Sequence, residues 1–139
     1  MSNYLGWWLF DAIALAGAAL LIPSGNEGDH LFIALNDPGR FEGYGSNPCV
    51  VLVNLSSVRE GVPYDATCVL DAGEHEFVRH PSFVFCRNAR IEPESHVLRL
   101  VEQGLFKPHV AVSAEVLQRI KSGLFASPHT KREFKRFKF

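Results

Sequence analysis

Short runs of β-forming residues follow one another closely through the first two thirds of this chain, and turn residues separate them. Four runs carry the pattern: AALLIPSG, DHLFIALNDP, CVVLVNLSS and TCVLDAGEHEFVRHPSFVFCRNARI. No helix-length segment lies between them, and polar residues stand at the junctions. This arrangement predicts a small antiparallel barrel that carries a polar site on one rim.

Turn clusters set the expected boundaries of the strands. We expect a strand from about Ala18 and further strands over His30–Leu35, Cys49–Leu55, Thr67–Leu70 and Ser82–Cys86. The run Cys49–Leu55 is the most hydrophobic and predicts a central strand that is buried on both faces. The connection over residues 36–48 is long for a hairpin, and such loops are often functional.

Beyond Pro93 the hydrophobic period changes to that of a helix. We expect Ser95 to cap a helix that runs to Gln103, with Gly104 as its stop, and Ser113 to cap a second helix. The length of 139 residues suits one domain. Its expected parts are an N-terminal apolar helix (1–16), a β-barrel (17–92), two helices (93–125) and a basic, aromatic tail (126–139).

The N-terminal segment LGWWLFDAIALAGAALLI is borderline in length for a membrane span, which needs about 20 apolar residues. Asp11 interrupts the segment, and the positive n-region of a signal peptide is missing. We therefore favour a short amphipathic helix whose Trp7, Trp8 and Phe10 cover one end of the barrel or a partner surface. A membrane anchor is the alternative.

The charge of the chain is small overall and uneven along the sequence. The net charge is −1, which does not indicate a polyanion as partner of the whole molecule. The last nine residues, KREFKRFKF, hold five basic residues and one acid. They could stack on or neutralise single-stranded nucleic acid, or simply form a solvated end.

Three cysteines, Cys49, Cys68 and Cys86, lie in runs that read as strand interior. An odd number argues against a disulfide framework, and the absence of CxxC or CxxH pairs argues against a zinc site. The pattern indicates buried, reduced thiols in a cytoplasmic protein.

Histidines are the first candidates for chemistry because their ordinary pKa lies near neutrality. His30 opens a strand directly after a turn, and His75 and His80 flank another segment in which a bend would bring them together. Surface histidines in turns are the plainer interpretation. A metal site formed by these three with Asp29 or Glu74 also remains open.

Serines and arginines near the strand ends are the second group. Ser56 and Ser57 close the most hydrophobic strand, where a hydroxyl could bind a phosphate oxygen or merely terminate the strand. Arg79, Arg87 and Arg90 cluster near the histidine pair and suit bidentate phosphate binding. A solvated rim of the barrel would explain them equally well.

The series of strands resembles the PemK/MazF-like endoribonuclease toxins of toxin–antitoxin pairs, which have an SH3-like barrel with added helices. AALLIPSG, HLFIALNDP and VVLVNLSS resemble the first three strands of that family, HPSFVFCRNARI its late segment, and SAEVLQRIKSGL its terminal helix. The chain departs from the family before the second strand, where a catalytic arginine is replaced by the segment NEGDH. His30 must then take its place, or His75 and His80 must act.

The resemblance implies a mainly β fold with C-terminal helices and metal-independent cleavage of single-stranded RNA, without a cofactor. The catalytic residues it suggests are His30, His80, Ser56, Ser57 and Arg90, and the substrate-binding residues are Arg79, His75, Arg87, Arg40 and Tyr44. It also implies an antitoxin protein and a homodimer as partners, a cytoplasmic location and no membrane. The alternative is a non-catalytic SH3-like interaction module that binds a protein or nucleic acid.

Overall fold

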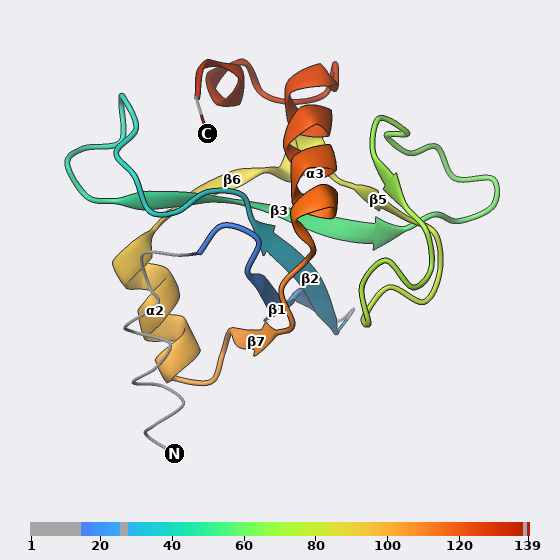
Figure 1. Cartoon of the computed structure of the whole chain (residues 1–139), viewed down its shortest axis with the longest axis horizontal. Helices are drawn as coiled ribbons and strands as arrows, with labels where there is room; N and C mark the ends of the chain where they lie inside the picture. Colours follow the sequence, from blue (N-terminus) through green and yellow to red (C-terminus); the bar gives the residue numbers. More distant parts are fainter. Residues whose placement is uncertain (1–14, 26–27, 138) are drawn as a thin grey trace.

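The computed structural model describes residues 15–25, 28–137 and 139 (Figure 1). Their strands are β1 (Ala19–Pro23), β2 (Asp29–Ala34), β3 (Cys49–Ser57), β4 (Val69–Leu70), β5 (Ser82–Val84), β6 (Arg90–Pro93) and β7 (Lys107–His109). The helices are α2 (Glu94–Glu102) and α3 (Ala114–Ala126), with short 3₁₀ turns η2 (Cys86–Asn88) and η3 (Arg132–Arg136). The expected mainly β fold with C-terminal helices is confirmed. The expected N-terminal helix lies outside the described residues.

β3 is the central strand, as its hydrophobic run predicts. The sheet has the antiparallel order β4-β5-β3-β2-β1-β7, and β6 pairs with the first half of β3. β5 pairs with the other end of β3, so this strand belongs to two parts of the sheet. Across the described strands, β4 and β7 remain separate edges, and the sheet is not closed.

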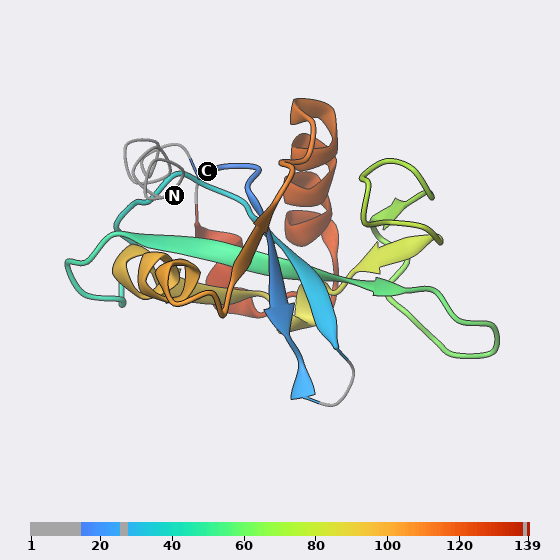
Figure 2. The ribbon, with the colours of Figure 1, turned by 90° about the horizontal axis from the view of Figure 1, so that it is seen from below.

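The two helices cover opposite faces of the sheet (Figure 2). The sequence of β3 explains why both faces are covered: successive side chains of a strand point to opposite faces, and both sets are apolar in its first half. Val51 and Val53 pack in one core cluster with the apolar stripe of α3, whereas Val50 and Leu52 pack in a second cluster with α2. In Figure 2, α3 lies above β3 and α2 lies below its N-terminal half.

Both helices begin and end close to the expected residues. Ser113 caps α3 as predicted, since its hydroxyl accepts a hydrogen bond of 3.1 Å from the amide of Val116. The prediction that Ser95 caps α2 is wrong: the helix begins at Glu94, and Pro93 occupies the cap position without a side-chain bond. Gly104 follows this helix with a φ of 78°, a conformation that favours glycine.

Four strands differ from the expectation. β4 is shorter than the predicted Thr67–Leu70, and β6 was not predicted as a strand. The predicted strand Ser82–Cys86 is shorter, because η2 follows β5 and turns the chain so that β6 can return along β3. β7 was not predicted, since it has three residues and Pro108 at its centre. Proline is tolerated there because β7 is an edge strand, paired only with β1 among the described strands.

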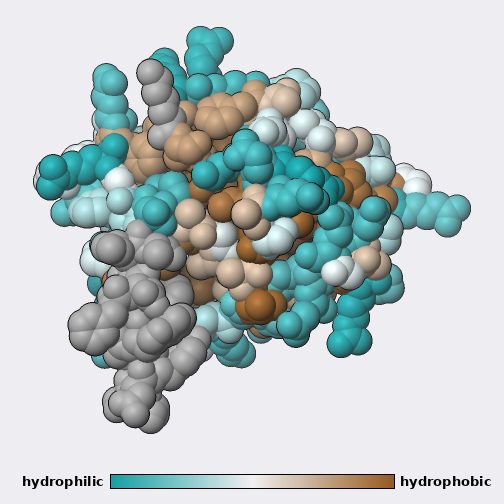
Figure 3. Space-filling model, in the orientation of Figure 1, coloured by the Kyte–Doolittle hydropathy of each residue, from teal (hydrophilic) through white to brown (hydrophobic). Residues whose placement is uncertain are grey.

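The C-terminal tail is docked on the protein by its phenylalanines rather than extending as a solvated end. Phe134 and Phe137 are buried, and the Phe137 ring lies 4.5 Å from that of Phe41 between centroids. In the space-filling view of this side, hydrophilic side chains cover the outer surface of α3 (Figure 3).

No helix of the described chain is both long and apolar enough to cross a membrane.

Candidate nucleic-acid groove

A groove lies on the sheet face that α2 covers only in part. Its lining includes His30, Phe32, Asn54, Ser56 and Arg90 but no residue of α2. On β2, His30 and Phe32 point to the same face of the sheet as Ala34, because every second side chain of a strand points to one face. On β3, Asn54 and Ser56 likewise point to the same face as Leu52. All four side chains therefore lie on the α2 side of the sheet. On this face, α2 covers only the N-terminal half of β3. The uncovered half of the face forms the floor of the groove.

The groove is large and open, with a volume of about 1310 Å³. Its walls come from three segments: the loop over residues 58–66, the approach to β5, and the turn after it. Seven of the ten residues predicted for the site line it: His30, His80, Ser56, Ser57, Arg79, Arg87 and Arg90. The fold thus gathers two histidines, two serines and three arginines from four separate stretches of sequence.

Aromatic rings form a continuous part of the lining. Phe83 lies 5.5 Å from Tyr64 and 5.4 Å from Phe85 between ring centroids, and all three line the groove. Phe83 is buried, whereas Tyr64 is 42% exposed. Aromatic side chains beside a cationic surface are the features on which single-stranded nucleic acids stack.

Cations outnumber free acids in the groove. Arg59, Arg79 and Arg87 are exposed, and no carboxylate of the described residues forms an ion pair with them. Of the two acids in the lining, Asp29 pairs with Lys107 at 3.7 Å and Asp65 is hydrogen-bonded on the α3 side. The groove therefore has an excess of positive charge that suits a phosphate backbone.

Arg90 is held in place by two neighbours. Its guanidinium lies 4.8 Å from the centre of the Phe32 ring, and its Nε lies 3.3 Å from a carboxylate oxygen of Glu92. These contacts fix the side chain at the groove floor without using all of its donors. An arginine stays charged at any physiological pH, so Arg90 can stabilise negative charge on a bound phosphate.

The wall formed by residues 58–66 is fastened to the end of α3. The buried Ser127 hydroxyl donates a 2.6 Å hydrogen bond to Asp65, and Thr67 donates another of 2.6 Å. Burial acts to raise the pKa of Asp65, but the hydrogen bonds from Ser127 and Thr67 outweigh it and hold this pKa below its ordinary value. Asp65 thus positions the wall that carries Arg59 and Tyr64.

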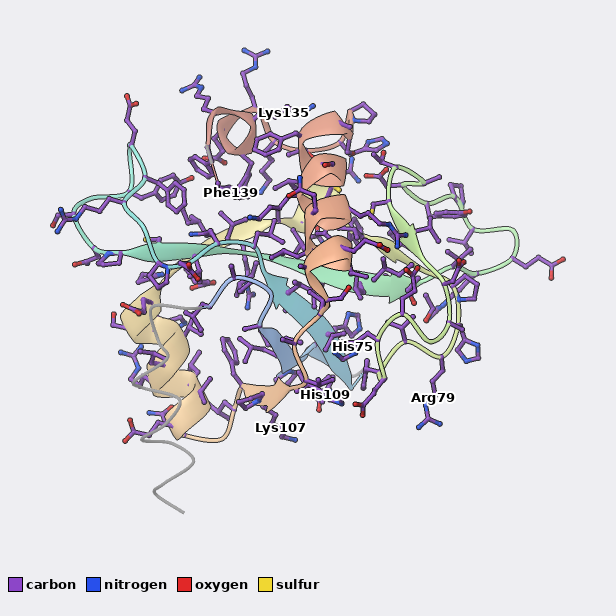
Figure 4. All side chains as sticks on the ribbon, viewed as in Figure 1. His75, Arg79, Lys107, His109, Lys135 and Phe139 are labelled. Atoms are coloured by element: carbon purple, nitrogen blue, oxygen red, sulfur yellow. The ribbon has the colours of Figure 1, made fainter. Side chains whose placement is uncertain are left out.

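Three predicted substrate-binding residues lie outside the groove lining. His75 is buried, its Nε2 is 2.6 Å from the Val110 carbonyl, and its Nδ1 accepts a hydrogen bond from the Phe77 amide. Because Nδ1 accepts a hydrogen bond, the ring proton is on Nε2, and this N–H donates a hydrogen bond to the Val110 carbonyl. Figure 4 shows His75 beside His109 and Arg79 projecting away from the ribbon. The bend that would bring His75 to His80 instead turns His75 into the protein.

Arg40 and Tyr44 belong to the loop on which the C-terminal segment docks. The Arg40 Nε donates to the carbonyl of Ser46 at 2.9 Å, and the Tyr44 hydroxyl donates to Glu133 at 2.5 Å. Tyr44 also packs against Phe137. Arg40 and Tyr44 therefore lie outside the groove, on a loop whose Tyr44 contacts the C-terminal segment.

Several lining residues were not predicted as part of the site: Phe32, Asn54, Arg59, Tyr64, Phe83, Phe85 and His129. The alternation of Phe83 and Phe85 on one side of the same stretch was a usable signal, since it places two rings on one sheet face. No local signal marks His129, which reaches the groove from the C-terminal segment only because Ser127 is bonded to Asp65.

The predicted metal-site alternative is not assembled either: the described residues contain no group of three metal-ligating side chains.

Comparisons of this chain with models of known protein families, with curated proteins and with solved structures find no match. The groove is therefore interpreted from its own geometry.

Proposed function

We propose that this protein is a metal-independent endoribonuclease that cleaves single-stranded RNA and acts as the toxin of a toxin–antitoxin pair. One observation supports this most: residues suited to acid–base chemistry, phosphate binding and base stacking line the same groove. The excess of arginine over free carboxylate favours a polyanionic substrate. The exposed aromatic rings favour unpaired bases over a duplex.

The proposed reaction is attack of a ribose 2′-oxygen on the adjacent phosphorus, which breaks the bond to the 5′-oxygen of the next nucleotide. A base must accept the 2′-hydroxyl proton, and an acid must donate a proton to the departing 5′-oxygen. We assign these two roles to His30 and His80. Arg90 stabilises the charge that develops on the phosphate oxygens, and Ser56 or Ser57 donates a hydrogen bond to one of them.

Residues at the rim of the groove bind the substrate. Arg79 and Arg87 are exposed and bind phosphates on either side of the scissile bond, while bases stack on the rings of Tyr64 and Phe85. We also propose that the open sheet is a variant of the SH3-like barrel of PemK/MazF-like proteins, with β3 shared between its two parts. A cytoplasmic location belongs to the same proposal, and three free thiols are compatible with it.

The test is cleavage of a mixed single-stranded RNA by purified protein in EDTA. We expect the wild type to yield 2′,3′-cyclic phosphate ends, and His30→Gln or His80→Gln to cleave at least about 100-fold more slowly, as expected for loss of an acid–base group. His96→Gln is the matched control, because His96 lies on α2 and does not line the groove. Equal rates for all four proteins would contradict the assignment.

A second candidate is a binding module without catalysis. The segment NEGDH, which leads into β2 and includes its first two residues, holds no arginine or lysine, and this favours binding without chemistry. In that case wild-type protein binds a fluorescent single-stranded RNA but leaves it intact, and its expression does not arrest growth. Growth arrest that depends on His30 and His80 supports the nuclease instead.

A further inference from the structure

The C-terminal segment over residues 131–137 presents its cations from a fixed backbone. Phe137 packs against Phe41, Tyr44 and Phe134, with centroid distances of 4.5, 6.0 and 5.4 Å. Phe134 is buried beside it. Because both phenylalanines point into the protein, the side chains between them are directed outward.

The segment carries four exposed cations, Lys131 and Arg132 before Phe134 and Lys135 and Arg136 after it. Figure 4 shows Lys135 at the top of the molecule, on the turn formed by η3. Within the described part of the chain none of the four forms an ion pair. The one acid of the segment, Glu133, accepts the hydrogen bond from Tyr44. We call these four residues the basic ridge.

The basic ridge begins two residues after the lining of the groove ends along the chain. His129 lines the groove, and Lys131 follows two residues later. The amide of His129 donates a 3.0 Å hydrogen bond to the Ser127 hydroxyl, which is itself bonded to the groove wall at Asp65. The chain just before the ridge is thus fastened to the same wall that carries Arg59 and Tyr64.

We propose that the basic ridge is a second binding surface for the RNA strand that occupies the groove, an inference that rests on the proposed function. The ridge contacts phosphates beyond the groove and reads no bases, since its phenylalanines are buried and cannot stack. It therefore adds affinity for longer strands independently of their sequence. A membrane surface is the weaker fit, because interfacial segments insert apolar side chains that here pack inside the protein.

The experiment measures RNA binding by fluorescence anisotropy in a His30→Gln, His80→Gln background, which prevents cleavage. One RNA has about 4 nucleotides and the other about 12, within the range of ~4–16 that single-stranded grooves cover. The test variant carries Lys131→Gln, Arg132→Gln, Lys135→Gln and Arg136→Gln. Arg132→Gln alone and Arg99→Gln form a matched pair of exposed arginines, one on the ridge and one on α2.

We expect the fourfold variant to bind the short RNA as the background protein does and the long RNA much more weakly. The slope of log affinity against log salt for the long RNA should fall by about 3, since each phosphate contact on a single strand contributes ~0.7. Arg132→Gln should lower this slope by less than 1, and Arg99→Gln should leave it unchanged.

Other results would overturn the proposal in distinguishable ways. Equal weakening for both RNA lengths would mean a general charge effect, and no weakening would mean a ridge that does not touch RNA. Binding of wild-type protein to phosphatidylserine vesicles that the fourfold variant loses, with RNA binding intact, would assign the ridge to a membrane. If neither RNA binds the background protein, the groove itself is not an RNA site.

Discussion

Gly123 lies where α3 packs tightly against Cys68, the residue just before β4. A Cβ at this position would stand 2.7 Å from the Cβ of Cys68, closer than real Cβ atoms approach. The two groups are attached directly to backbone, so no side-chain rotation relieves the clash. Glycine in the middle of a helix is here a packing requirement, although it lowers helix propensity by about 1 kcal/mol relative to alanine.

We expect Gly123→Ala to lower the free energy of unfolding by up to about 2 kcal/mol, since overpacking costs ~1–3 kcal/mol and the gain in helix propensity offsets about 1 kcal/mol of it. Urea denaturation followed by circular dichroism gives the value. The control is Ser122→Ala on the exposed side of the same helix, which should be neutral or slightly stabilising. A Gly123→Ala protein as stable as the wild type would show that α3 can move away from Cys68 without loss.

Asp65 provides a prediction on pH because its pKa is held below the ordinary value. Burial opposes this shift, and the hydrogen bonds from Ser127 and Thr67 produce it. A lowered folded-state pKa stabilises the protein above the unfolded pKa of about 3.9, and this stabilisation is lost as the pH falls through the folded value. We expect Asp65→Asn to lower the free energy of unfolding at pH 7 by about 1–3 kcal/mol, as for other hydrogen bonds to charged groups.

The difference between Asp65→Asn and wild type should shrink as the pH is lowered below about 3.9, where the unfolded carboxyl is protonated. Urea titrations over this range measure it. Asp71→Asn, at an exposed carboxylate, serves as the reference for a general loss of charge. A difference that is independent of pH would mean that the carboxylate charge at Asp65 does not contribute.

At the scale of elements, local sequence decided where the helices and the main strands lie, but not how long each strand is paired. The first five residues of β3, Cys49 to Val53, form an unbroken apolar run and make this strand recognisable from composition alone. β7 has a central proline and only three residues, so its pairing depends on β1 lying beside it. The short β5 ends where η2 begins, a turn that no strong breaker in the sequence announces.

The docked C-terminal segment is an element whose stability should be separable from that of the sheet. We expect Phe137→Ala to release residues 131–137, because this ring contacts Phe41, Tyr44 and Phe134. Hydrogen exchange of the amides in this segment should rise at least tenfold, which corresponds to ~1.4 kcal/mol of local stability. Amides of β2 and β3 should keep their protection.

Phe77→Ala is the control for that experiment, because Phe77 is 41% exposed and lies outside the segment. Its exchange over residues 131–137 should match the wild type. If Phe137→Ala instead lowered the protection of β3 to the same extent, the segment would be part of the main cooperative unit. The basic ridge would then depend on the whole fold rather than on this one ring.

For the molecule as a whole, the three free cysteines report on global unfolding. Cys49, Cys68 and Cys86 are buried, at 3%, 6% and 0% exposure. Burial raises the pKa of Cys86 to about 11, and it also raises the pKa of the other two thiols. Since the thiolate is the reactive form, these side chains should be nearly inert in the folded protein.

We expect an alkylating reagent to produce intact protein with either no label or three labels, as read by mass spectrometry. Labelling should be slow in buffer and rapid in guanidinium chloride, because all three thiols require the same global opening. Ser57→Cys places a thiol at an exposed position and should be labelled quickly in the folded protein. Accumulation of species with one or two labels would reveal separate opening of one part of the sheet.

Local features of this protein could be predicted from its residues: the apolar first half of β3, the stop of α2 at Gly104, the cap of α3 at Ser113, and the residue types of the groove. These depend on periodicity and on chemistry within a few residues. The tertiary structure decided which face of the sheet each helix covers, and therefore that the half beyond α2 stays open. It also turned His75 toward Val110 and brought His129 to the groove through Ser127 and Asp65. Such contacts join residues 35 to 62 positions apart, and only the packed chain as a whole specifies them.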